Sequence, residues 1–247
     1  MKILKENGFN SLLLAVFPAF VCVCVIFAFI SSSFCKVSTM NTSTNDLPHS
    51  LPVLIIDAGH GGEDGGTVGI NGVFEKELNL KIAENINQLA LSCGYDTVMT
   101  RSEDVLLYDR NVDFKGRKKA LDLLARVKIA EKYENAVFIS IHMNAFPDGK
   151  YSGLQVYYSK NNEGSKELAE SIQATVKNTL QASNNRKIKV ADENIFVLDR
   201  VTHPAVLIEC GFLSNEEECT LLSSEEYQKK LALSIFFAVS KYIEMPT

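Results

Sequence analysis

Three short runs of apolar, mostly β-branched residues recur along the chain and predict strands inside a sheet. They read VLIID at 53–57, VFISIH at 137–142 and AVLIE at 205–209. Nearly continuous apolar runs of this length are typical of parallel strands covered on both faces. The segments 95–101 and 154–159 alternate apolar and polar residues more, which predicts edge or partly exposed strands.

The segments between these strands carry apolar residues at helical spacing. Apolar positions recur every three or four residues in 75–94, and residues 119–133 and 165–180 repeat the pattern. A last helix is predicted to follow a capping box formed by Ser223 and Glu226. This alternation of strands and helices predicts a single α/β domain, with a mostly parallel sheet covered by helices on both faces.

The first 35 residues differ from the rest of the chain. Within them, residues 12–30 form a run of 19 residues without a charge, which is long enough to span a bilayer. Serines follow the run, as small residues do at a signal-peptide cleavage site. Residues 1–35 are therefore predicted to be an N-terminal membrane anchor or a signal peptide.

The remaining chain divides into a linker and one folded domain. Residues 36–52 are polar and predict a flexible tether, and residues 53–247 are long enough to bury a full core. Lys2 and Lys5 favour an inside N-terminus, with the folded domain on the extracytoplasmic side, either anchored or secreted.

Charge and cysteine content argue against a nucleic-acid partner and against a disulfide framework. The net charge of −5 and the isoelectric point near 5.5 give no reason to expect nucleic acid as a partner. Cys93, Cys210 and Cys219 are scattered through the folded domain. This favours small buried residues over a disulfide framework.

Candidate chemistry gathers at the predicted strand ends. His60 follows the first apolar strand, His142 closes the second and Glu209 closes the third. Open α/β sheets place their binding crevices at the carboxyl ends of strands, so these three side chains are predicted to converge.

A catalytic zinc site commonly uses two histidines and one carboxylate, with a further position left for water. Glu75 lies ahead of the first helix, across a glycine-rich loop that can fold back toward His60. Glu77 is interpreted differently, as an acidic residue that favours the helix dipole.

Four segments now carry a resemblance to a known family. IIDAGHGGEDGG, GVFEKELNL, SIHMNA and PAVLIECGFLSN, in this order, resemble the signature blocks of the zinc-dependent N-acetylmuramoyl-L-alanine amidases (the amidase-3 family). The resemblance covers essentially all of the folded domain. It implies that His60, Glu75 and His142 bind one zinc ion per chain, and that Glu209 is the catalytic acid/base.

The resemblance also implies the substrate and the setting. The substrate would be peptidoglycan, and the bond cut would be the amide between N-acetylmuramic acid and L-alanine. The combination of an N-terminal apolar segment with a catalytic domain that carries no wall-binding repeats resembles the CwlD-type amidases of the spore cortex and germination. That subgroup implies location in the forespore or cortex compartment and a lipoprotein or other spore protein as partner, although an anchored vegetative amidase would look much the same.

Further residues are predicted from their positions alone. Asn144, two residues beyond His142, and Arg200 are predicted substrate contacts, with Arg200 meeting a stem-peptide carboxylate through a bidentate pair. Asp57 or a loop carbonyl is predicted to orient a ligand histidine.

The sequence leaves two other function classes to compare with the amidase. One is a catalytically inactive peptidoglycan-binding or scaffold module that retains a structural zinc, and it requires Glu209 to be idle. The other is a phosphate-binding protein built on GHGGEDGG, which the absence of a P-loop lysine and the charges of Glu63 and Asp64 disfavour.

Overall fold

The computed structural model describes residues 51–109, 111 and 115–245. The predicted anchor or signal segment at 1–35 lies outside these residues, as does the predicted linker at 36–52 except for its last two positions. Among the described residues, no helix is both long enough and apolar enough to cross a membrane.

Six strands form one sheet in the order β2-β1-β3-β6-β4-β5. The first four strands in this order run parallel to one another, β4 runs antiparallel to β6, and β5 runs parallel to β4. The predicted mostly parallel sheet is thereby confirmed. The strands are β1 (Val53–Ala58), β2 (Thr97–Met99), β3 (Ala136–Asn144), β4 (Gln155–Tyr158), β5 (Lys189–Val190) and β6 (Ala205–Phe212).

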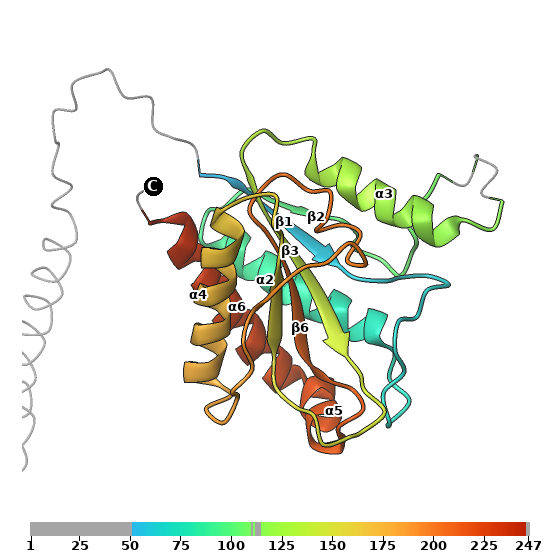
Figure 1. Ribbon diagram of the computed structural model, residues 1–247, viewed down its shortest axis with the longest axis vertical. Coiled ribbons are helices and arrows are strands. Elements are labelled where there is room, and N and C mark those ends of the chain that lie inside the picture. Colours follow the sequence, from blue (N-terminus) through green and yellow to red (C-terminus); the bar gives the residue numbers. More distant parts are fainter. Residues whose placement is uncertain (1–50, 110, 112–114, 246–247) are drawn as a thin grey trace, which may run out of the picture. The chain divides into compact units, whose positions relative to one another are not determined.

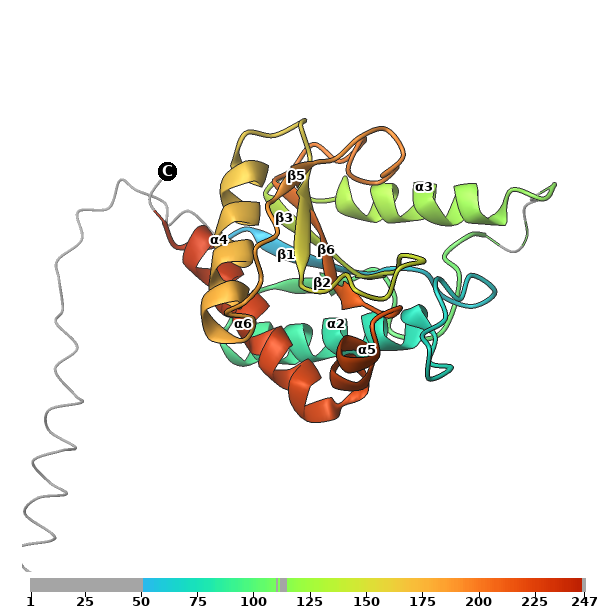
Figure 2. The same cartoon turned by 60° about the horizontal axis from the view of Figure 1, so that its bottom comes forward.

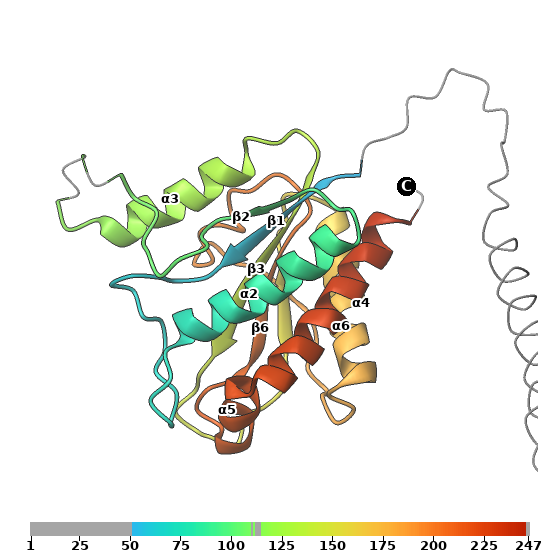
Figure 3. The ribbon, with the colours of Figure 1, turned by 180° about the vertical axis from the view of Figure 1, so that it is seen from behind.

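Helices cover both faces of this sheet, as predicted. Figure 2 shows α3 on one side of the strands and α2, α4 and α6 on the other, and Figure 3 shows α2 and α6 crossing the sheet side by side. The short helix α5 precedes α6 at one end of the sheet (Figure 1). The helices are α2 (Glu75–Ser92), α3 (Lys118–Ala130), α4 (Gly164–Thr179), α5 (Glu216–Ser223) and α6 (Glu225–Ile243).

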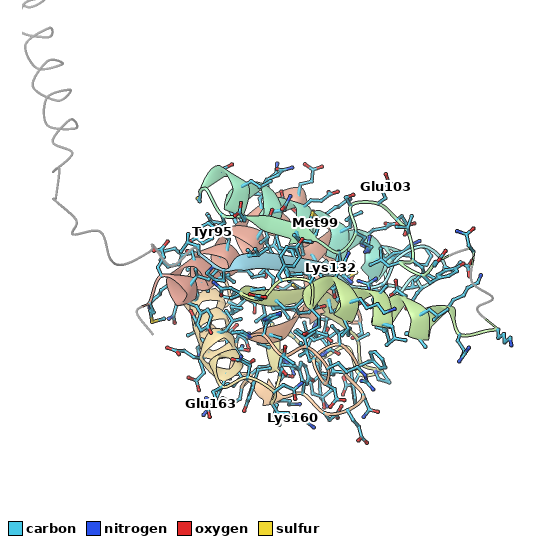
Figure 4. All side chains as sticks on the ribbon, turned by 90° about the horizontal axis from the view of Figure 1, so that it is seen from above. Tyr95, Met99, Glu103, Lys132, Lys160 and Glu163 are labelled. Atoms are coloured by element: carbon cyan, nitrogen blue, oxygen red, sulfur yellow. The ribbon has the colours of Figure 1, made fainter. Side chains whose placement is uncertain are left out.

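The two covered faces explain why the central strands are almost continuously apolar. Leu54 and Ile139 pack with the layer of α2, α4 and α6, whereas Ile55 and Phe138 pack under α3 and the loop before β6. Burial of each such side chain contributes about 1.5–3 kcal/mol. Figure 4 shows the side chains from above, with Met99 on edge strand β2 and Lys132 just beyond the end of α3.

Two elements and one cap differ from the sequence-based expectation. The two-residue strand β5 and the helix α5 were not predicted. The predicted capping box is wrong, because Ser223 is the last residue of α5 and its hydroxyl donates to the Cys219 carbonyl oxygen. The N-cap of α6 is Ser224, and its side chain forms no capping hydrogen bond.

The register of the parallel strands sets up the site. His142 on β3 lies opposite Glu209 on β6, and Ala58 at the end of β1 lies opposite Ile141. A bulge follows, so that Asn144 pairs with Phe212. The carboxyl ends of β1, β3 and β6 therefore meet at one edge of the sheet.

Candidate metal centre and active site

The loop after β1 brings backbone very close to two of the predicted ligands. A Cβ at Gly59 would lie 2.2 Å from His142 Nε2. A Cβ at Gly66 would lie 2.5 Å from Glu75 Oε2. His60 itself has a φ of 61°, which few non-glycine residues adopt. Only glycine at positions 59 and 66 lets the chain turn this tightly around the side chains.

The three predicted metal ligands come together. One donor atom from each of His60, Glu75 and His142 lies within 4.8 Å of the other two. Glu75 Oε1 lies 3.2 Å from His60 Nε2 and 3.0 Å from His142 Nδ1. The two imidazole rings meet edge to face, with centroids 4.9 Å apart.

Glu75 is held as an ionised carboxylate by its surroundings. Its side chain is buried, and its oxygens accept hydrogen bonds from the backbone N–H groups of Thr67 and Met143. Burial alone would raise the pKa of Glu75, but hydrogen bonds from His142 and His60 and their charges hold that pKa far below its usual value. The ionised form is the one that binds a metal.

His60 has a second carboxylate on its other side. Asp64 Oδ1 lies 3.0 Å from His60 Nδ1, without the alignment of a hydrogen bond. Burial lowers the pKa of His60, but Glu75 and Asp64 together raise it above its ordinary value. A carboxylate in this position is typical of the groups that lie behind a metal-binding histidine. The sequence had instead predicted that Asp57 or a loop carbonyl orients a ligand histidine.

Asp57 belongs to a buried ion-pair network under the loop. Its carboxylate accepts from Thr100, Ser140 and Arg126, and not from a histidine. Burial would raise the pKa of Asp57, but the Arg126 guanidinium and these hydrogen bonds lower it. Asp57 therefore holds Arg126 rather than a ligand.

Arg126, on α3, connects that network to the loop that carries His60. Its guanidinium donates to the His60 carbonyl oxygen at 2.7 Å and to the Ala58 carbonyl oxygen at 2.8 Å. It also pairs with Asp122 one helical turn earlier, at 2.8 Å. Arg126 is only 2% exposed, so its orientation is fixed by these contacts.

Arg101 is a second buried arginine beneath the same loop. It donates to the carbonyl oxygens of Ala58, Gly59 and Lys76, at 2.8–2.9 Å. One guanidinium thus joins the end of β1 to the first turn of α2. Since His60 follows Gly59 and Glu75 precedes Lys76, this contact joins the two segments that carry the predicted ligands His60 and Glu75.

Glu209 projects from β6 beside this centre. Its Oε2 atom is buried and forms no hydrogen bond with another described residue. Burial, together with the negative charge of Glu75, raises the pKa of Glu209 to about 7, although His142 and His60 oppose the shift. A carboxyl group with a pKa near 7 can both accept and return a proton at neutral pH.

The two predicted substrate contacts lie in different places. Asn144 closes β3 next to the site, and its side chain forms no hydrogen bond with another described residue. Arg200 lies in the loop before β6, where it stacks on Phe196 and pairs with Asp199. That loop packs on the strand starts rather than the strand ends, so the structure does not bring Arg200 to the metal ligands.

Sequence reasoning missed the groups that hold the ligands: Arg101, Arg126 and Asp64. One signal was present in the sequence. Asp122 and Arg126 are spaced by one helical turn on the side of α3 that carries Leu123 and Val127. A charged pair on an apolar helix face indicates a buried ion pair.

The donor set fits a divalent metal ion. Two imidazoles and one ionised carboxylate are the ligands commonly found at catalytic zinc, and they leave further coordination positions open. The close approaches at Gly59 and Gly66 position His142 and Glu75, and carboxylate and arginine contacts hold the segment that carries His60.

Comparison with known proteins agrees with this geometry. The family model described as N-acetylmuramoyl-L-alanine amidase matches residues 54–241. The germination-specific N-acetylmuramoyl-L-alanine amidase of Bacillus subtilis is 36% identical over 196 residues, which cover 79% of this chain and 81% of that protein.

Solved structures are similar as well. The CwlD amidase from Clostridioides difficile, solved in complex with the GerS lipoprotein, aligns with a TM-score of 0.73 and 40% identity, covering 77% of this chain and 98% of that one. The catalytic domain of CwlV, an amidase from Bacillus (Paenibacillus) polymyxa, aligns with a TM-score of 0.65 and 31% identity, covering 79% and 99%. The family resemblance noted in the sequence is confirmed, and the chain belongs to the N-acetylmuramoyl-L-alanine amidase family.

Proposed function

We propose that this chain is a zinc-dependent amidase that hydrolyses the bond between N-acetylmuramic acid and L-alanine in the peptidoglycan of the spore cortex. The observation that carries the proposal is the convergence of His60, Glu75 and His142 at one sheet edge, with Glu209 in register beside them. The germination-specific relative in Bacillus subtilis supports the spore setting.

His60, Glu75 and His142 would hold the zinc ion. A zinc ion there would polarise the carbonyl oxygen of the scissile amide and make a water molecule more acidic. The protein's own contribution is to keep Glu75 ionised, through two backbone N–H groups, and to keep His60 in place, through Arg126 and Asp64.

Glu209 would move the proton. In the attack it accepts the proton that water loses, and when the tetrahedral intermediate collapses it delivers that proton to the nitrogen of the departing L-alanine. Its pKa near 7 allows both transfers, because a proton carrier is most effective when its pKa lies near the working pH. A positioned acid/base contributes about 10²–10⁴-fold to the rate.

Asn144 and Arg200 remain proposed substrate contacts, but they lie at different distances from the bond that is cut. Asn144 lies at the end of β3 near the ligands, where its unpaired amide can bind the substrate close to the scissile bond. Arg200 lies beside the strand starts. A contact at Arg200 would therefore involve a part of the polymer far from the reacting atoms.

The partner and location are proposed from the sequence and one relative. The CwlD amidase was solved with a lipoprotein bound, which supports a lipoprotein partner for this chain. The apolar segment at 12–30 would act as anchor or signal peptide and place the enzyme outside the cytoplasm.

Incubation of the purified protein with isolated cortex peptidoglycan, with zinc and with a strong chelator, tests this function. Mass spectrometry of the soluble products should find free stem peptides that begin with L-alanine, and these should disappear with the chelator. Intact muropeptides in both samples would instead support the inactive module that retains a structural zinc.

A further inference from the structure

A half-buried arginine, which the sequence did not single out, contacts residues on β4 and β6 that pair with Glu209 and Asn144. Arg186, in the segment between α4 and β5, stacks its guanidinium on the ring of Phe212, 4.3 Å from the centroid. The ring of Tyr151 lies on the same guanidinium at 5.9 Å. The exposed ring of Phe146 packs edge to face on Tyr151.

Strand register places this arginine close to the acid/base. Gln155 on β4 lies directly opposite Glu209 on β6, and directly opposite side chains are about 4.5–5.5 Å apart at Cβ. Arg186 Nη1 donates to Gln155 Oε1 at 3.2 Å. A second link is Phe212, which pairs with Asn144 at the end of β3. Arg186 is therefore held between the partners of Glu209 and of Asn144.

The positive charge of Arg186 forms no salt bridge with a described residue, although at longer range it acts on the buried carboxyl of Glu218 and opposes the rise in the pKa of Glu218 that burial causes. Among the described residues, no Asp or Glu oxygen lies within 4.0 Å of its guanidinium nitrogens. Its Nε donates to the Ser152 carbonyl oxygen at 2.7 Å and its Nη1 to Gln155, and both acceptors are neutral. Nη2 forms no hydrogen bond with another described residue. Arg126, by contrast, pairs with both Asp57 and Asp122.

The segments around Arg186 are joined to one another by hydrogen bonds. Glu218 on α5 accepts from the backbone N–H groups of Gly153 and Phe212, each at 2.8 Å. Asn215 donates to the Gly149 carbonyl oxygen, and the Ser214 hydroxyl accepts from the Phe146 N–H. The loop that carries Phe146 and Tyr151 is thus fixed to the end of β6 and to α5. A preorganised cation loses little entropy when it binds an anion.

We propose that Arg186 binds a carboxylate of the stem peptide on the leaving side of the scissile bond, with Phe212 and Tyr151 as its stacking support. The inference rests on the proposed amidase function. The glycan side of a muramoyl amide carries no charge next to the bond, because the lactyl carboxyl is consumed in the amide. An unpaired arginine beside the acid/base therefore faces the peptide, whose second residue carries a free carboxylate about two residue lengths from the bond.

Two soluble substrates test the proposal. The first is N-acetylmuramoyl-L-alanyl-D-glutamate with its γ-carboxyl amidated, which keeps only the free α-carboxylate. The second is the same compound with the α-carboxyl amidated as well, so that it carries no carboxylate. Wild type should show a kcat/KM about 10- to 100-fold higher for the carboxylate, because a charge-assisted bidentate contact is made only there. Arg186→Gln should erase this difference by raising KM for the carboxylate alone, and Arg186→Lys should restore part of it.

Lys150→Gln is the matched control. Lys150 also lies over Tyr151, but its charge is already paired with Asp148 at 2.6 Å, so its loss should leave the substrate ratio unchanged. Zinc content and thermal midpoint verify that each variant is folded and loaded. Equal cleavage of both substrates by wild type, or an equal loss on both in Arg186→Gln, would overturn the proposal. If the wild-type protein cleaved neither soluble compound and also failed to cleave cortex peptidoglycan, the amidase function itself would be refuted.

Discussion

At the scale of single residues, the carboxyl groups of Glu75 and Glu209 differ most clearly in their surroundings and in their pKa values. Glu75 is buried among donors and far below its usual pKa, whereas Glu209 has an oxygen without a partner and a pKa of about 7. Two carboxylates in one site whose pKa values diverge this way are typical of different roles.

Glu209→Gln should therefore retain zinc and lose catalysis. The amide has nearly the same shape but cannot take a proton from water, so kcat should fall about 10²–10⁴-fold. Release of free amino groups from peptidoglycan measures the rate, and elemental analysis measures the zinc. A near wild-type rate in a fully loaded Glu209→Gln variant would contradict the acid/base assignment.

Much of the candidate site could be predicted residue by residue, because each of its main members follows an apolar strand or opens a helix. Arg126, Arg101 and Asp64 could not be. Their roles depend on which backbone carbonyls and ring nitrogens face them after folding. Arg186 is similar, since only strand register reveals that Gln155 lies opposite Glu209.

At the scale of elements, the loop that carries His60 is held by a helix distant in sequence. Arg126 on α3 bonds the carbonyl oxygens of Ala58 and His60, and its own charge is balanced by Asp57 and Asp122. Breaking such a buried pair typically costs 3–5 kcal/mol, because it leaves an uncompensated charge. A conservative change is therefore needed to examine the loop separately from the fold.

Arg126→Lys keeps the positive charge between the two aspartates but removes the planar fork that reaches the loop. Zinc affinity should fall about 10- to 100-fold, as it does when residues behind a metal ligand are changed. Competition against a chelator of known affinity measures it. Lys128→Gln, an exposed change on the same helix, should leave zinc affinity unaltered, and an equally unaltered Arg126→Lys would reject this role.

The sequence predicts the long helices and the central strands, but it does not predict the short elements β5 and α5. The central strands and the four long helices follow directly from apolar spacing, and the confirmed edge strand β2 follows from its alternation. The strand β5 has two exposed residues and forms only because β4 offers it an edge. The helix α5 begins with three glutamates after the N-cap Asn215, which accepts from the Glu218 N–H. The eight residues of α5 are too few for the spacing of its apolar residues to show a helical period.

At the scale of the folded domain, a metal ion at this centre would join parts of the chain that are distant in sequence. His60 follows β1, Glu75 opens α2 and His142 lies on β3. A ligand that binds only the folded state stabilises it by mass action, by about 2.7 kcal/mol at a concentration 100 times its Kd. For a domain of 150–250 residues, each kcal/mol raises Tm by about 2–4 °C.

Zinc at that concentration should therefore raise the Tm of the metal-free protein by about 5–11 °C. Glu209→Gln should show the same rise, since Glu209 is not a predicted ligand, whereas His142→Ala should show little or none. Calorimetry of the three proteins, each prepared with a chelator and then titrated with zinc, measures these shifts. An undiminished rise in His142→Ala would mean that zinc stabilises the fold from another site. Zinc binding by His60, Glu75 and His142 would then be rejected.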